Sequence, residues 1–126
     1  MTEYVSTRWY RAPELVMKST SYSTAIDIFA LGAIMTEMLI GRPVFPGRTE
    51  SDQLTAIVTV LGTPSQAQWP EGYRLATQHG IKFPQIGQSS LTSMLQDCGV
   101  SADAIDLIKR MLDYSPQKRI TAQQCL

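Results

Sequence analysis

The sequence carries no excess of charge of either sign. Lys and Arg together number 11, and Asp and Glu together also number 11, in a chain of 126 residues. Proteins that bind nucleic acid or an acidic membrane surface usually present a broad field of positive charge. We therefore expect neither partner, and we expect any bound anion to be held by a local group of cations.

Cysteine and histidine are also scarce. The chain has two cysteines, Cys98 and Cys125, and one histidine, His79, with no CxxC pair. Metal centres and disulfide frameworks need several such residues at short spacings, so neither is expected. This composition is typical of a reduced intracellular protein.

Long apolar runs are absent as well. No run reaches the length of a membrane span, and Met1 is followed by polar residues rather than by the apolar core of a signal peptide. We therefore expect neither membrane insertion nor secretion. Hydrophobic residues nevertheless make up 44% of the chain, which is typical of a globular domain.

The most apolar stretch is 24–40, TAIDIFALGAIMTEMLI. Ser23 or Thr24 can cap its start and Gly41 can end it, so the pattern predicts a helix with well-marked ends. Its apolar residues fall on nearly every side instead of along one stripe, and a helix of this kind must be surrounded. Because acidic residues interrupt the stretch, we expect protein rather than lipid around it.

Further helices are predicted on either side of a loop-rich region. The stretch 49–61, capped by Thr49 or Ser51, has one apolar stripe. Ser101 precedes another amphipathic stretch, and Thr121 can begin a last short helix.

The region 63–100 is punctuated by Gly and Pro. We therefore expect it to be a surface insert with little regular structure. No segment stands out with the alternation of a strand, so the predicted fold class is mainly α.

Four motifs occur together along the chain: YVSTRWYRAPE, DIFALG, GRPVFPG and MLDYSPQKRITA. In this order and at these spacings they resemble the C-terminal lobe of eukaryotic protein kinases, over essentially all 126 residues. The resemblance implies a mainly α lobe that lacks the N-terminal lobe of the protein kinase-like fold. It divides the chain into the end of the activation segment at 1–14, core helices at 15–62, a group-specific insert at 63–100 and C-terminal helices at 101–126.

Two stretches indicate which group of protein kinases the chain resembles. TRWYRAPE is similar to the group of cyclin-dependent, MAP and related kinases, and Thr-Glu-Tyr at 2–4 matches the dual phosphorylation motif of MAP kinases. VLGTPSQAQWPEGYRLA at 60–76 is more similar to the male germ cell-associated and intestinal cell kinases, a family associated with cilia and flagella. We favour that family over a MAP kinase proper, and expect the protein in the cytoplasm, the nucleus or a cilium.

The opening TEYVSTRWYR places hydroxyls beside cations. A phosphorylated Thr2 or Tyr4 would carry roughly two negative charges, and an Arg guanidinium binds phosphate oxygens in pairs. By resemblance, an upstream kinase phosphorylates Thr2. Phosphorylated Tyr4 then docks on Arg8 and Arg11 and orders the loop that receives the residue after the substrate's phosphoacceptor, usually Pro. Outside this motif, Arg8 and Arg11 would be solvated surface cations.

Four other positions match the family's motifs. Thr7 matches a Thr that hydrogen-bonds the catalytic Asp in Ser/Thr kinases, which favours Ser or Thr substrates; outside the motif it is an ordinary loop residue. Glu14 and Arg119 match a buried, architectural ion pair. Asp27 matches a carboxylate that catalytic-loop amides hold, although an Asp in the first turn of a helix is also favoured by the helix dipole alone.

The motifs that hold ATP are missing from this sequence. It has no Gly-x-Gly-x-x-Gly loop, no His-Arg-Asp and no Asp-Phe-Gly, with which kinases place the phosphates and the metal. We therefore assign no catalytic residue and no metal ligand here, and expect ATP and Mg²⁺ to be bound by a longer parent. That parent would be a proline-directed Ser/Thr kinase acting on Ser/Thr-Pro sites in proteins. The alternatives are a noncatalytic lobe that binds partner proteins, or a truncation that does not fold.

Overall fold

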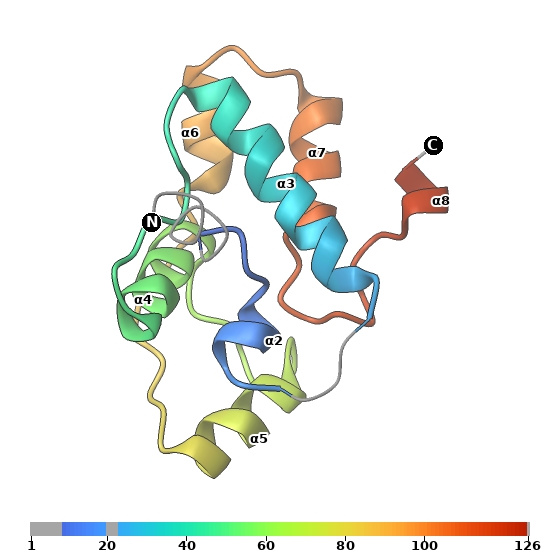
Figure 1. Ribbon diagram of the computed structural model, residues 1–126. Helices are drawn as coiled ribbons and strands as arrows, with labels where there is room; N and C mark the ends of the chain where they lie inside the picture. The colour runs from blue at the N-terminus through green and yellow to red at the C-terminus, as the bar shows by residue number, and fades with distance from the viewer. Residues whose placement is uncertain (1–8, 20–22, 126) are drawn as a thin grey trace.

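The computed structural model of the protein describes residues 9–19 and 23–125. Within these ranges the regular structure is helical and contains no strand, as the sequence predicts. Figure 1 shows the helices gathered around α3, with α6 and α7 along one part of it and α2, α4 and α5 beyond the other. The helices are α2 (Pro13–Val16), α3 (Ala25–Ile40), α4 (Glu50–Leu61), α5 (Pro70–His79), α6 (Leu91–Asp97), α7 (Ala102–Met111) and α8 (Ala122–Cys125).

Three of the predicted helix ends are confirmed, whereas Thr24, at the start of α3, makes no capping hydrogen bond with its side chain. Gly41 ends α3 in the left-handed conformation, with φ of 83°, which glycine adopts without steric cost. The Thr49 hydroxyl caps α4 by accepting from the Asp52 amide, and Ser101 caps α7 in the same way. Short polar side chains therefore fix where these helices begin.

Close helix packing places α7 against α3. A Cβ at Gly32, inside α3, would lie 3.0 Å from Met111 Cβ and 3.0 Å from Leu112 Cδ2. The bare glycine therefore lets α7 and the residue after it approach α3 closely.

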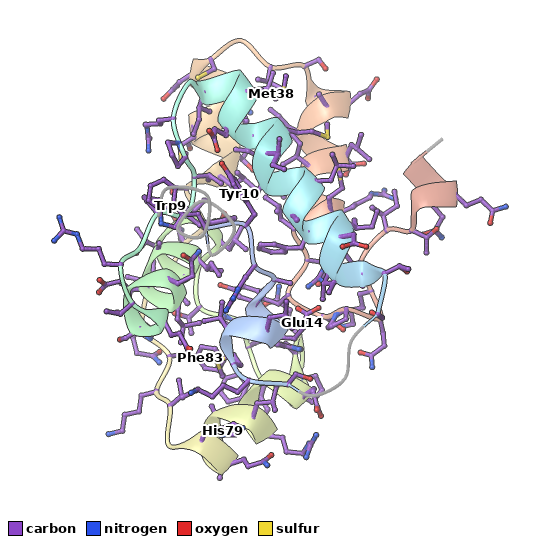
Figure 2. The ribbon with its side chains drawn as sticks, viewed as in Figure 1. Trp9, Tyr10, Glu14, Met38, His79 and Phe83 are labelled. Carbon is purple, nitrogen blue, oxygen red and sulfur yellow. The ribbon has the colours of Figure 1, made fainter. Side chains whose placement is uncertain are left out.

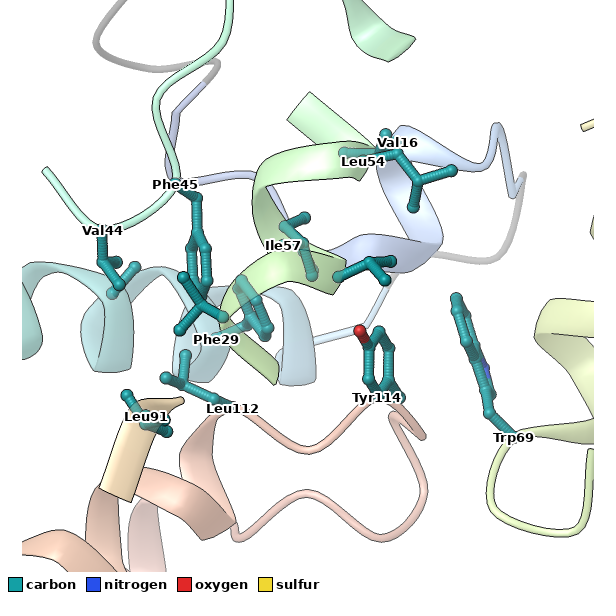
Figure 3. Close-up of a cluster of buried hydrophobic side chains, with 14 of the residues drawn as sticks. Val16, Phe29, Val44, Phe45, Leu54, Ile57, Trp69, Leu91, Leu112 and Tyr114 are labelled. Atoms are coloured by element: carbon teal, nitrogen blue, oxygen red, sulfur yellow. The ribbon is translucent and has the colours of Figure 1, made fainter. Parts of the chain in front are cut away.

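An apolar core joins these helices to the segments between them (Figure 3). The rings of Phe29 in α3 and Phe45 in the following loop stack with centroids 5.6 Å apart. The rings of Trp69 and Tyr114 stack with centroids 5.5 Å apart. Since these residues are far apart in the sequence, their burial ties distant parts of the chain together.

The prediction for 63–100 was wrong in two respects. Two helices, α5 and α6, form there, and Trp69 is fully buried rather than on the surface. Pro70 lies in the first turn of α5, where its missing N–H costs nothing and its fixed φ favours the helix, while Gly80 ends α5 with φ of 66°. The Pro and Gly residues thus mark the ends of structure in this region rather than its absence.

Hydrogen bonds of Thr63 join the start of this region to Pro84 and Ile86. Its amide donates to the Ile86 carbonyl at 3.1 Å, and its hydroxyl donates to the Pro84 carbonyl at 2.6 Å. The same hydroxyl accepts from the Ile86 amide at 2.7 Å. We call this set of three bonds the Thr63 latch. Nearby, the hydroxyl of Tyr114 donates to the Gly62 carbonyl at 2.6 Å, and burial raises the pKa of this phenol.

One face of α3 is not covered by the described residues, as expected for a helix that needs protein on every side in a chain that resembles only one kinase lobe. Met38, labelled near the end of this helix in Figure 2, is 79% exposed. Asp27, in the first turn, is exposed too. None of the described helices is long and apolar enough to cross a membrane. The exposed large apolar residues of α3 are Leu31, Ile34, Met38 and Leu39.

We expect this apolar face to make the purified 126-residue chain self-associate, because contiguous exposed apolar surface favours association. The double substitution Leu31→Lys and Met38→Lys should shift the protein toward monomer, as measured by sedimentation velocity. Gln88→Lys with Gln96→Lys is the matched control, since it adds the same charge at exposed positions elsewhere. A wild-type chain that sediments as a single monomeric species would contradict this expectation.

Candidate functional site

The predicted docking residues fall partly outside the described residues. Thr2, Tyr4, Thr7 and Arg8 lie in the undescribed stretch 1–8, so the structure does not place them. Arg11 is described and half-buried. The site can therefore be built from Trp9 to Glu14, which continues the same motif into α2.

The lobe holds Trp9 at both its side chain and its backbone. The indole Nε1 donates to the Gly47 carbonyl at 2.9 Å. The side-chain amide of Gln53, in α4, donates to the Trp9 carbonyl at 3.4 Å and to the Phe45 carbonyl at 2.7 Å. Trp9 is thus attached both to the loop before α4 and to α4 itself.

Tyr10 attaches the same segment to α3. Its hydroxyl donates to Oε1 of Glu37 in a short hydrogen bond. This bond raises the pKa of Tyr10 to about 12, because it stabilises the protonated phenol, and partial burial and the nearby Glu37 carboxylate add to the effect. Tyr10 therefore stays protonated at neutral pH and keeps donating to Glu37.

Glu14 and Arg119 form the ion pair that anchors the segment's end. The guanidinium binds the carboxylate in a bidentate manner, with Nη1 donating to Oε2 at 2.9 Å and Nη2 donating to Oε1 at 3.1 Å. Both side chains are almost fully buried. The guanidinium also lies 5.2 Å from the ring centroid of Phe29. Its remaining donors bind the backbone carbonyls of Ala25, Asp113 and Tyr114. Such a network satisfies both buried charges.

Asp27 lies apart from these contacts. It is exposed in the first turn of α3, where the helix dipole favours a negative charge. Nor does the described part of the chain hold a cluster of three or more His, Cys, Asp or Glu residues that could bind a metal ion. The contacts of the described site hold and position a segment of backbone.

Sequence reasoning missed several residues that hold this segment. Gln53 looks like an ordinary polar residue of an amphipathic helix, and Gly47 like a loop glycine. The acidic residue inside the apolar helix at 24–40, Glu37, was a signal that could have been used, because a carboxylate there needs a donor. Nothing in the sequence pattern pairs it with Tyr10.

The whole length of the chain, residues 1–126, matches the family described as protein kinase domain. The chain belongs to the protein kinase domain family. Its helices are those of the C-terminal lobe, as the kinase motifs predict.

Similar proteins include several Ser/Thr kinases. The chain is 47% identical to serine/threonine-protein kinase MAK of Homo sapiens over 125 residues, covering 99% of this chain and 20% of that protein. It is 46% identical to serine/threonine-protein kinase ICK of Mus musculus, with the same coverage. It is 43% identical to cyclin-dependent kinase F-4 of Oryza sativa subsp. japonica, covering 99% of this chain and 27% of that protein. This kinase chain thus spans about a fifth to a quarter of the length of such relatives.

Proposed function

We propose that this chain is the substrate-docking part of a proline-directed Ser/Thr protein kinase. The observation that carries the proposal is the attachment of one short segment at successive points: Trp9 to the Gly47 loop and α4, Tyr10 to α3, and Glu14 to Arg119. A segment fixed at so many points presents a constant surface to a peptide. Fixed geometry of this kind is what phosphoryl transfer requires, because positioning supplies much of the catalysis.

The preference for Pro follows from a property of that residue. In our proposal the docking loop offers no acceptor at this point, and because Pro has no backbone N–H, its binding would leave nothing unpaired. Any other residue would bury an unsatisfied donor. The kinase would therefore select Ser-Pro or Thr-Pro sites in protein substrates.

Activation would act on the same segment. In our proposal an upstream kinase phosphorylates Thr2, and phosphorylated Tyr4 is held by the guanidinium forks of Arg8 and Arg11. We also propose a location in the cytoplasm, the nucleus or a cilium, which is what the family resemblance implies.

The parent kinase would use ATP and Mg²⁺, but this chain does not fit them. Its sequence lacks the Gly-rich loop, the His-Arg-Asp and the Asp-Phe-Gly of kinases, and its described residues hold no acidic cluster for a metal. We therefore assign ATP and Mg²⁺ to no residue of this chain.

The proposal is tested with a longer kinase that contains this chain. We expect kcat/KM for a Ser-Pro peptide to exceed that for the matched Ser-Ala peptide roughly tenfold or more, which corresponds to about 1.4 kcal/mol of discrimination. A Tyr-Pro peptide, which offers a phenol in place of an aliphatic hydroxyl, is the control and should be a poor substrate. Equal kcat/KM values for Ser-Pro and Ser-Ala would show that the kinase is not proline-directed.

A noncatalytic module that binds partner proteins is the second candidate. The exposed apolar residues of α3 favour it, since such a surface can bind another protein. The transcript upstream of Met1 separates the two. An in-frame catalytic loop there supports the kinase, whereas an upstream stop codon supports the binding module.

A further inference from the structure

We propose that Gln53 is a positioning residue for substrate recognition, which acts by holding the backbone of Trp9 within the docking segment. The proposal rests on the proposed function and extends it from the motif to a residue on α4. Gln53 touches no substrate in this arrangement. Its effect would reach the substrate through Trp9 and the residues that follow it toward Arg11.

The burial of Gln53 indicates that its amide has a specific task. The side chain is fully buried, and its Oε1 has no hydrogen-bond partner among the described residues. Its Nε2 donates to two carbonyls, those of Phe45 at 2.7 Å and Trp9 at 3.4 Å. A buried acceptor left unpaired is a cost that an apolar side chain of the same shape would avoid. The hydrogen bonds that Nε2 donates are therefore what this side chain contributes beyond an apolar residue of the same shape.

The two carbonyls that Gln53 holds belong to separate segments. Phe45 is part of the buried core before α4, and its ring stacks on Phe29 of α3. Trp9 belongs to the docking segment and is only partly buried. The amide therefore links a segment that the core fixes to one that the core fixes less completely.

Gly47, in the loop before α4, also holds Trp9. Its carbonyl accepts from the Trp9 indole at 2.9 Å. A Cβ at Gly47 would lie 2.7 Å from the Gln53 amide nitrogen and 2.9 Å from the Gln53 Cα. The loop and the first turns of α4 are therefore in direct contact, with no room for a side chain between them. Trp9 is held at its ring by the loop and at its carbonyl by α4, so it cannot shift without breaking one of these bonds.

The test compares two substitutions in the longer kinase, Gln53→Glu and Gln53→Met. Met matches the shape and removes the donor, while an ionised Glu also sets a negative charge against two carbonyl oxygens. Both should raise KM for the Ser-Pro peptide, with Glu raising it roughly tenfold at pH 8, the cost of about one lost hydrogen bond. KM for ATP should stay unchanged, because no residue of this chain is assigned to ATP.

A pH profile separates positioning from general damage to the fold. The protonated carboxyl of Gln53→Glu can donate to the Phe45 carbonyl, and burial raises the pKa of such a group. Its KM for peptide should therefore fall toward the wild-type value as the pH is lowered from 8 to 6. Gln53→Met should show only the pH dependence of the wild type. Gln96→Glu, an exposed change of the same type on α6, is the matched control and should leave both KM values unchanged.

A spectroscopic measurement keeps this test independent of the proposed function. With 5-fluorotryptophan in the kinase, the ¹⁹F resonance of Trp9 is assigned by its loss in Trp9→Phe and should shift in both Gln53 variants. If the wild type does not phosphorylate the Ser-Pro peptide, the proposed function fails, and a shifted Trp9 resonance still supports the role of Gln53. An unshifted resonance, or an active kinase whose peptide KM is unchanged in both variants, overturns the inference.

Discussion

Replacing Arg119 by Met is expected to destabilise the folded protein by about 3 to 5 kcal/mol, because it leaves the buried carboxylate of Glu14 without its partner. The substitution also removes the donors that satisfy backbone carbonyls from two distant parts of the chain, those of Ala25 and Asp113. Loss of this size is a large fraction of the stability of an ordinary domain. Urea unfolding of both proteins gives the difference in their free energies of unfolding, provided that this free energy falls with urea concentration at the same rate in both.

Two further variants test whether the stability loss in Arg119→Met comes from the buried ion pair. Arg110→Met removes the exposed pair that Arg110 Nε makes with Asp106 at 3.0 Å, and it should cost less than about 1 kcal/mol. Glu14→Gln keeps the shape and removes the charge, so in combination with Arg119→Met it should recover part of the stability. If Arg119→Met and Arg110→Met shift the urea midpoint equally, the buried pair has no special role.

Replacing Gly72 by Ala is expected to be destabilising by roughly 1 to 3 kcal/mol or more, against the usual trend. In an open helix this change stabilises by about 0.5 to 1 kcal/mol, because glycine has the greater backbone freedom to lose. Here the added Cβ would lie 2.2 Å from Cε3 of Trp69. That ring is fully buried and stacks on Tyr114, with Phe83 at a centroid distance of 6.2 Å, so it cannot move away without disrupting the core.

Gly87→Ala is the matched control for Gly72→Ala. No atom lies within 4 Å of a Cβ built at Gly87, and its backbone is not in the left-handed region. This control should be neutral or slightly stabilising. Thermal unfolding of both variants tests the argument, and a Gly72→Ala protein at least as stable as the wild type would show that the Trp69 ring has room to shift.

Helix positions could be predicted from the sequence where local chemistry decides them. Ser101 and Thr49 were identified as caps because their hydroxyls suit the first turn of a helix, and both cap in the structure. Thr121 likewise accepts from the Gln124 amide at the start of α8. These interactions span three residues, so a short stretch of sequence contains all the information that they need.

Features that depend on distant residues could not be predicted in this way. The Gly and Pro residues of 63–100 were taken as signs of loops, although they mark the ends of α5 and α6, and Trp69 stacks on Tyr114, which lies well beyond both helices. The family motif did place Glu14 and Arg119 as a pair, and the structure brings them together. The hold of Gln53 on Trp9 joins residues 44 apart and has no motif, so only coordinates show it.

The Thr63 latch has a consequence for the order in which the chain folds. Its bonds close a loop of 21 to 23 residues, whereas the pair of Glu14 and Arg119 closes one of 105 residues. The entropy of loop closure makes the longer loop less favourable by about 1.3 kcal/mol. We therefore expect contacts around the latch to form while the ends of the chain are still apart, and the ion pair to close later. Interactions that form this late act mainly on the rate of unfolding, so the ion pair would set how long the folded lobe persists, while the latch would set how readily it begins to form.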